Sequence, residues 1–200
     1  MTTTFFLVRH AAHDRVETVL CGRMPGVRLG DAGKMQAQAL AERFASEDDI
    51  ASIHTSPLER AVETAEPIAA RLGRIAERSS DIIEIDFGAW SGKSFDMLAD
   101  DRHWTSWNSS RSTSRPPGGE TMLEAQARIV RAMEQLRRLH SGRSVILVSH
   151  GDVIKAALLY YLGMPIDSYA RLDVSPASIS TLAVGDWGSK VLRMNEVLAP

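Results

Sequence analysis

The sequence predicts an α/β fold, a single three-layer domain whose mainly parallel central sheet is flanked by helices. Short apolar runs rich in strand-forming residues occupy residues 5–8, 50–55 and 145–148. Further along the chain, each run is followed by a segment with apolar residues at helical spacing. Because neighbouring parallel strands need crossover connections, usually helices, this alternation favours a parallel sheet covered by helices. We expect one domain over residues 1–200, since this length is typical of one folded unit.

The other elements follow in order along the chain. Helices are expected over residues 31–44, from 56 to about 72, over 120–139 and from about 152 to 161. A closing pair of strands is expected over residues 177–184 and 190–197. Residues 87–90 look like a loop, and the polar, Ser- and Arg-rich residues 94–119 look like an irregular, partly helical surface excursion.

Two helix starts carry recognisable end signals. Ser56, Pro57 and Glu59 have the spacing of a capping box, with serine at the cap and proline at the first helical position. The second helix should therefore begin at Ser56. Glu120 stands where the third helix is expected to start, so its carboxylate should interact favourably with the helix dipole.

Composition excludes several classes of function. The net charge of −2, with 44% hydrophobic and 24% charged residues, gives no reason to expect nucleic acid or an acidic membrane as a partner. The single cysteine, Cys21, cannot form an internal disulfide. No apolar run approaches the ~20 residues needed to span a bilayer, and residues 1–8 lack the basic region and cleavage site of a signal peptide. We therefore expect a cytoplasmic protein.

Chemically active side chains stand where the predicted strands end. Arg9 and His10 follow the first strand, Arg60 lies in the first turn of the helix after the second, and His150 follows the third. Glu84 comes after Ile82 and Ile83, just before a glycine-containing loop. In open α/β sheets, ligands bind beyond the carboxyl ends of the strands, so these side chains are expected to share one site.

These residue types suit phosphoryl transfer. An arginine fork matches phosphate oxygens and stays charged, and a neutral imidazole can attack phosphorus and become a phosphohistidine. A carboxylic acid can protonate the leaving alcohol and later accept a proton from water. A cation such as Arg60 near a helix N-terminus is unfavourable unless an anion is present, which also favours a phosphate site. Such a site needs no metal, because arginine and histidine supply the positive charge.

A set of segments in fixed order supports this interpretation. They are LVRH at 7–10, GR at 22–23, LG at 29–30, GKMQA at 33–37, TSPLERA at 55–61, EIDFGAW at 84–90, PGGE at 117–120 and VSHG at 148–151. Together they resemble the motifs of the histidine phosphatase superfamily, the phosphoglycerate mutase-like proteins. The resemblance extends from about Phe5 to beyond Asn195, and the ordered set is far more specific than any one segment.

The resemblance implies a phosphoglycerate mutase-like fold and a role for each site residue. His10 would be the nucleophile, and Arg9, Arg60 and His150 would hold the phosphate. Glu84 would donate and accept the proton. The resemblance further implies no cofactor, no metal and a small phosphomonoester as substrate.

The chain departs from the family pattern beside the nucleophile. Ala11 stands where the family usually has glycine. Many members place a phosphate-binding asparagine a few positions later, whereas this chain reads His-Asp-Arg-Val at 13–16. We expect His13, Arg15 or Arg23 to supply the missing donors to the phosphate.

Three other functions are compatible with the sequence. A phosphoglycerate-type mutase would use the same phosphohistidine but return the phosphoryl group to an alcohol. A metal-dependent hydrolase would use His10, His13, Asp14 and His150 as ligands. A non-catalytic module would only bind the phosphorylated ligand. The compact chain favours the phosphatase over the longer dedicated mutases of the family.

Overall fold

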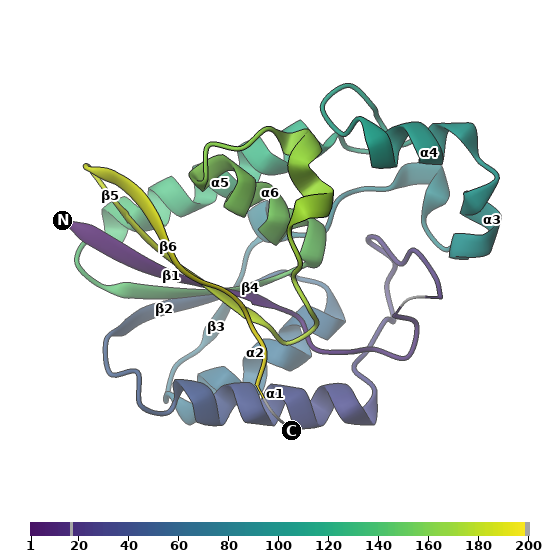
Figure 1. Cartoon of the computed structure of the whole chain (residues 1–200). Helices are drawn as coiled ribbons and strands as arrows, with labels where there is room; N and C mark the ends of the chain where they lie inside the picture. Colours follow the sequence, from purple (N-terminus) through teal and green to yellow (C-terminus); the bar gives the residue numbers. More distant parts are fainter. Residues whose placement is uncertain (17, 199–200) are drawn as a thin grey trace.

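A mixed sheet forms the centre of the molecule. Over residues 1–16 and 18–198, which the computed structural model describes, the sheet has six strands in the order β3-β2-β4-β1-β5-β6 (Figure 1). The strands are β1 (Thr2–Arg9), β2 (Ile50–Thr55), β3 (Ala76–Arg78), β4 (Ser144–Ser149), β5 (Ile179–Gly185) and β6 (Gly188–Glu196). The first four are parallel, while β5 and β6 are antiparallel to their neighbours. The predicted α/β fold with a mainly parallel sheet is therefore confirmed.

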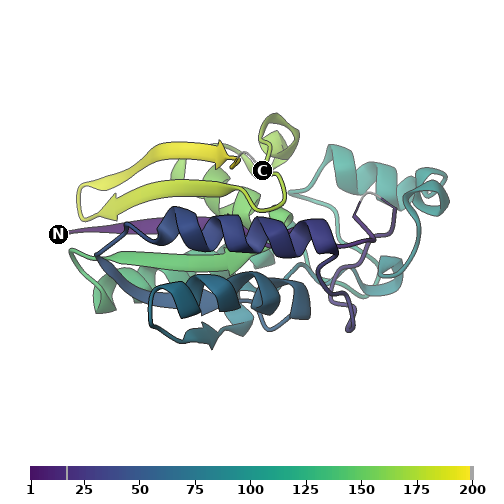
Figure 2. The ribbon, with the colours of Figure 1, turned by 90° about the horizontal axis from the view of Figure 1, so that it is seen from below.

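Helices cover both faces of this sheet. One face carries α1 (Asp31–Phe44) and α2 (Glu59–Arg71), and the other carries α5 (Met122–Leu139) and α6 (Gly151–Tyr161) (Figures 1 and 2). Shorter helices occupy the connections: η1 (Ser80–Ile82), η2 (Gly88–Trp90), α3 (Phe95–Ala99), α4 (Arg102–Ser109) and η3 (Ile166–Arg171). Among the helices of the described residues, none has both the length and the apolar character needed to cross a membrane.

The apolar runs are continuous because both faces of the central strands are buried. In β1, Phe6 and Val8 point into the core beneath α1 and α2, while Phe5 and Leu7 point into the core beneath α5 and α6. Successive strand residues face opposite sides of a sheet, so a strand buried on both sides shows no polar alternation. This burial fixes the direction of β1 and thereby the position of its last residue, Arg9.

The start of the second helix differs from the prediction. Helix α2 begins at Glu59, and Ser56 does not cap it. The Ser56 hydroxyl instead lies 2.7 Å from Nε2 of His150 and accepts a hydrogen bond from the Leu58 amide. The predicted capping box is therefore wrong, because the hydroxyl orients a buried histidine. Arg60 nevertheless lies in the first turn of α2, as expected.

Glu120 also differs from its expected role. Helix α5 starts at Met122, and its capping box is formed by Thr121 and Glu124. Glu120 lies before the helix, and its carboxylate accepts hydrogen bonds from the guanidinium groups of Arg23 and Arg128. The carboxylate thus holds two arginines of neighbouring segments rather than acting at a helix terminus.

The carboxyl ends of the parallel strands meet at one end of the molecule. Arg9 of β1 is level with Ser149 of β4, and the His10 amide donates to the Ser149 carbonyl. Both views show the segment carrying α3 and α4 beyond this end of the sheet, beside the connection between β1 and α1 (Figures 1 and 2). The segment over residues 94–119 is partly helical, as predicted.

Candidate active site

His10 lies at the end of β1 with its ring orientation fixed. Its Nδ1–H donates to the carbonyl of Ala11 at 2.9 Å, so the lone pair of the neutral ring is on Nε2. Only 3% of the residue is exposed. Burial, followed by the charges of Arg60 and Arg9, lowers the pKa of His10 well below its usual value. The imidazole is therefore neutral at pH 7, the state that a nucleophile requires.

Arg60 joins the two histidines from the first turn of α2. Its Nε donates to Nε2 of His10 at 3.3 Å, and one terminal nitrogen reaches Nδ1 of His150 at 3.2 Å. The same nitrogen donates to the carbonyl of Gly22 at 2.8 Å. The other terminal nitrogen, NH1, is buried without a hydrogen-bond partner among the described residues. Because an unpaired buried donor is costly, this N–H is suited to an anion.

Arg9 provides a second guanidinium near His10. One terminal nitrogen donates to the Val174 carbonyl at 2.6 Å, which ties β1 to the chain entering β5. The Nε atom of Arg9 is buried and unpartnered within the described chain.

His150 lies beside this cluster at the start of α6, completely buried. Because the arginine nitrogen can only donate to Nδ1, the proton of neutral His150 is on Nε2 and donates to the Ser56 hydroxyl. Burial and the charge of Arg60 lower the pKa of His150 well below its usual value. The free site thus holds a neutral ring, whose centroid is 5.1 Å from that of His10.

Glu84 approaches the same cluster from the loop between η1 and η2. Its carboxyl is 3.9 Å from Nδ1 of His150, and its other oxygen accepts a hydrogen bond from the Ile85 amide. The side chain is 13% exposed. Burial, and then the charge of Asp152, raise the pKa of Glu84 to about 7, although Arg60 opposes the rise. A large fraction of this carboxyl is therefore protonated at neutral pH.

Comparison with known proteins agrees with this geometry. Residues 5–197 match the model of the histidine phosphatase superfamily (branch 1). The chain belongs to this superfamily. An uncharacterized protein of Mycobacterium tuberculosis is 34% identical over 184 residues, which cover 90% of this chain and 89% of the relative. Phosphoserine phosphatase 1 of Hydrogenobacter thermophilus is 28% identical over 94% of this chain and 90% of its own.

Solved structures of the superfamily share the whole fold. Bacillus stearothermophilus YhfR superposes with a TM-score of 0.91 at 26% identity, covering 98% of both chains. Mycobacterial glucosyl-3-phosphoglycerate phosphatase superposes with a TM-score of 0.88 over 98% of this chain and all of its own. At 23% identity, this second likeness supports the fold alone. The predicted resemblance to the phosphoglycerate mutase-like phosphatases is confirmed.

Within this histidine phosphatase, Arg23 contacts the loop that carries Glu84. Its Nε donates to the Glu84 carbonyl at 2.7 Å, and a terminal nitrogen donates to Glu120 at 2.9 Å. Arg128 holds Glu120 from the other side and reaches the Asp81 carbonyl. Arg23 does not line the pocket that contains His10. The contacts of Arg23 therefore support the position of Glu84 rather than a direct contact with phosphate.

His13 lines the pocket next to His10. The two rings stack with centroids 5.4 Å apart and planes 29° apart. Nδ1 of His13 accepts from the Arg15 amide at 3.3 Å, so the proton of the neutral ring is on Nε2. Burial and the charges of Arg60 and Arg9 lower the pKa of His13 to about 4. His13 is therefore a neutral N–H donor where the sequence predicted a substitute for asparagine.

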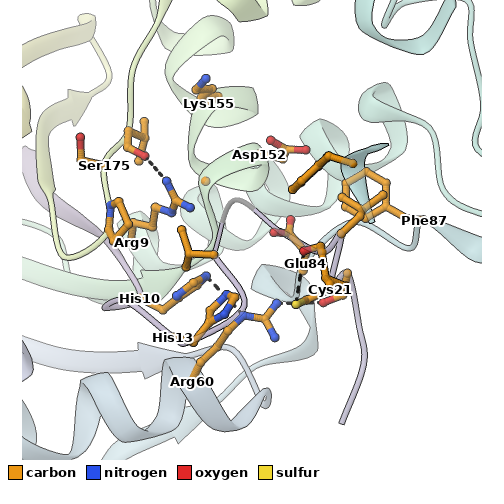
Figure 3. Close-up of a pocket in the computed structure, with 18 of the residues that line it drawn as sticks. Arg9, His10, His13, Cys21, Arg60, Glu84, Phe87, Asp152, Lys155 and Ser175 are labelled. Carbon is orange, nitrogen blue, oxygen red and sulfur yellow. Dashed lines mark hydrogen bonds between the residues drawn. The ribbon is translucent and has the colours of Figure 1, made fainter. Parts of the chain in front are cut away.

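Arg9, His10, His13, Arg60 and Glu84 line a pocket of about 370 Å³, whereas His150 is not part of the lining (Figure 3). Apolar side chains form one wall, and residues of α6, η3 and the chain before β5 form another. This second wall contains five charged or polar side chains that were not predicted from the sequence: Asp152, Lys155, Tyr169, Asp173 and Ser175. Asp152 and Lys155 follow His150 at the start of a helix, a signal that points toward the site. Nothing in the sequence marks Tyr169 or Asp173.

The arrangement contains no grouping suited to a metal ion. Within the part of the chain that the structure describes, no three or more His, Cys, Asp or Glu side chains are placed to hold one. His10, His13, Asp14 and His150 thus do not form the ligand cluster that a metal-dependent hydrolase would require. Two arginines occupy the space beside His10 instead.

Proposed function

We propose that this protein is a metal-independent phosphomonoester hydrolase that acts through a phosphohistidine on His10. The observation that carries the proposal is the pairing of a neutral His10, whose Nε2 lone pair faces Arg60, with a Glu84 whose pKa is about 7. A nucleophile must be unprotonated and a general acid protonated at the same pH. His10 and Glu84 meet both requirements near neutrality.

The reaction would proceed in two steps. Nε2 of His10 attacks phosphorus, and the bond from phosphorus to the leaving oxygen breaks while Glu84 protonates that oxygen. Water then attacks the phosphohistidine, Glu84 accepts a proton from the water, and phosphate leaves as the bond to Nε2 breaks. The enzyme returns to its starting state, with no change in oxidation state and no additional reactant.

The phosphate would be held by the donors that lack partners in the free site. These are Nε of Arg9 and NH1 of Arg60, both buried and unpaired in the described structure. Nε2–H of His13 would add a neutral donor in place of the family's asparagine. His150, which does not line the pocket itself, would act on the phosphate through Arg60, whose terminal nitrogen donates to its Nδ1. Such preorganised donors stabilise the charge that develops in the transition state.

The substrate is proposed to be a small phosphorylated metabolite. A pocket of about 370 Å³ is at the lower end of the range for small-molecule sites. A relative that matches over 94% of this chain is named phosphoserine phosphatase 1, which supports a phosphatase that acts on small soluble substrates. A cytoplasmic location and the absence of nucleic-acid and membrane partners stay predictions.

Release of phosphate without a primer separates the hydrolase from the mutase. We expect the purified protein to release inorganic phosphate from nitrophenyl phosphate and from small alkyl phosphates with no bisphosphate added. Phosphate release would be followed with each substrate over many turnovers. A requirement for a bisphosphate, with isomerised phosphoester as the product, would favour the mutase. Binding without any turnover would favour the non-catalytic module.

Activity should also survive removal of divalent cations. The positive charge at the site comes from Arg9, Arg60 and the surrounding N–H groups, so no metal is needed to stabilise the transition state. We expect the rate of phosphate release to change by less than about twofold after prolonged chelation and desalting, within ordinary experimental variation. Loss of activity on chelation and recovery with an added divalent ion would contradict the proposal.

A further inference from the structure

We propose that Lys155 and Asp173 recognise the leaving group, and that the preferred substrate is a phosphorylated amino acid. In this arrangement Lys155 binds the carboxylate of the leaving alcohol, and Asp173 binds the neighbouring ammonium. The inference rests on the proposed hydrolase function and assigns a substrate class to its pocket.

The pocket walls differ sharply in character above the phosphate-binding groups. Figure 3 shows Lys155 and Asp152 on the helix above His10 and Arg60, with Glu84 and Phe87 to one side. The apolar wall consists of Val16, Val19, Leu20, Phe87 and Phe95. Another part of the lining, from α6, η3 and the chain before β5, contributes the charged groups. A leaving group attached to phosphorus at His10 must extend between these two walls.

Lys155 is a cation without an anionic partner in this wall. Its ammonium lies 4.2 Å from the centroid of the Tyr169 ring, and within the described residues no carboxylate forms a hydrogen bond or ion pair with it. The side chain is partly buried, and this burial lowers the pKa of Lys155 despite the nearby Asp152 and Asp173. A partly desolvated cation gains from a bound anion, because the anion replaces lost hydration.

The two nearby carboxylates are not equivalent. Asp152 accepts a hydrogen bond from the Tyr169 hydroxyl and lies 3.5 Å from a terminal nitrogen of Arg111. The guanidinium of Arg111 is itself 3.9 Å from the Tyr169 ring centroid. The Asp152 carboxylate therefore already has partners, the Tyr169 hydroxyl and the Arg111 guanidinium. Asp173 is exposed, and no hydrogen bond or ion pair engages its side chain in the described structure.

Asp173 is next in sequence to a residue that contacts the phosphate-binding end of the pocket. It directly precedes Val174, whose carbonyl holds Arg9 at 2.6 Å. The wall therefore presents one unpaired cation and one unpaired anion close to the phosphate-binding groups. An amino acid supplies the complementary pair, a carboxylate and an ammonium on one carbon. A second phosphate would instead place extra negative charge against Asp152 and Asp173, which is unfavourable.

Four phosphomonoesters test the carboxylate and the ammonium of the leaving group separately. Ethyl phosphate carries neither group, phosphoglycolate only the carboxylate, phosphoethanolamine only the ammonium, and O-phosphoserine both. We expect kcat/KM of the wild type to be highest for phosphoserine. Lys155→Met should lower kcat/KM about tenfold to a hundredfold for phosphoglycolate and phosphoserine, the worth of a charge-assisted hydrogen bond. Ethyl phosphate and phosphoethanolamine should be nearly unaffected.

Asp173→Asn should show the complementary pattern. Since Asp173 is exposed, the loss should be only about twofold to fivefold for phosphoethanolamine and phosphoserine. Lys190→Met and Asp100→Asn remove the same charges at exposed positions outside the pocket, and all four rates should stay unchanged. These controls separate local recognition from a change in net charge.

The outcomes separate this inference from the proposed hydrolase. Turnover of nitrophenyl phosphate and ethyl phosphate with no preference for charged leaving groups would overturn the inference and leave the hydrolase standing. An equal loss on all four substrates in Lys155→Met would overturn it too, since that pattern indicates a structural role. No turnover of any substrate, nitrophenyl phosphate included, would reject both.

Discussion

Replacement of His10 by alanine is expected to abolish turnover, with a loss on the order of 10³-fold or more. Nε2 of His10 carries the lone pair of the neutral ring and lies 3.3 Å from Nε of Arg60, in a pocket that Arg9 also lines. Brief incubation of wild type with a labelled phosphomonoester and a rapid quench should leave label that is lost in acid and kept in base. This lability identifies a phosphohistidine, and peptide mapping should place the label on His10.

The fold should survive this substitution. His10 makes one side-chain hydrogen bond to its neighbour Ala11 and one to Arg60, while the main chain around it is held by Ser149 and Ala177. His103→Ala, at an exposed position of α4, provides the matched control and should keep full activity. Circular dichroism should match among the three proteins. Acid-stable label, or an active alanine variant with a native spectrum, would reject His10 as the nucleophile.

The strand ends were predictable because their signals are local. A continuous apolar run such as residues 5–8 must be buried on both faces, and this places Arg9 and His10 at the edge where parallel strands end. The same reasoning placed His150 beside them, and the register of β1 and β4 agrees with it. The family motifs then assigned a catalytic role to each of the candidate residues at the strand ends.

The remaining features depend on contacts between distant segments. The spacing of Ser56 and Glu59 is compatible with a helix cap. The Ser56 hydroxyl instead binds His150, which is 94 residues away in the sequence. Glu120 likewise takes its role from Arg23 and Arg128 instead of from the helix beside it. Asp173 enters the pocket because the chain before β5 anchors Arg9. Periodicity and local spacing carry no information about such pairs.

Burial acts in opposite directions on the two central catalytic candidates. Desolvation disfavours the charged form of any group, so it lowers the pKa of His10 and raises the pKa of Glu84. The result is a neutral base and a neutral acid in one pocket at neutral pH. Separation of pKa values by environment is how acid and base roles are assigned in many enzymes. The carboxylate of Asp152 reinforces the rise at Glu84, while Arg60 limits it.

Glu84→Gln tests the acid directly, and its effect should depend on the leaving group. An alkoxide leaves poorly without a proton, whereas nitrophenolate leaves readily. Positioned proton transfer is worth ~10²–10⁴-fold. We therefore expect phosphoenzyme formation in single-turnover experiments to slow by about that factor with an alkyl phosphate, and by much less with nitrophenyl phosphate. Steady-state rates are less informative, because Glu84 also activates water and breakdown of phospho-His10 then limits both substrates.

The pH dependence provides a second readout of the same group. Only protonated Glu84 can donate, so in wild type the formation rate with an alkyl phosphate should fall as pH rises through about 7. His10 stays neutral over this range because its pKa is lowered. Titration of the nucleophile therefore causes no rise in the formation rate that would offset this fall. Glu84→Gln should remove the fall, and Glu63→Gln, outside this pocket, should retain it. Equal losses for both substrates with an unchanged pH profile would show that Glu84 positions the phosphate or its loop. In that case another group would have to supply the proton to the leaving oxygen.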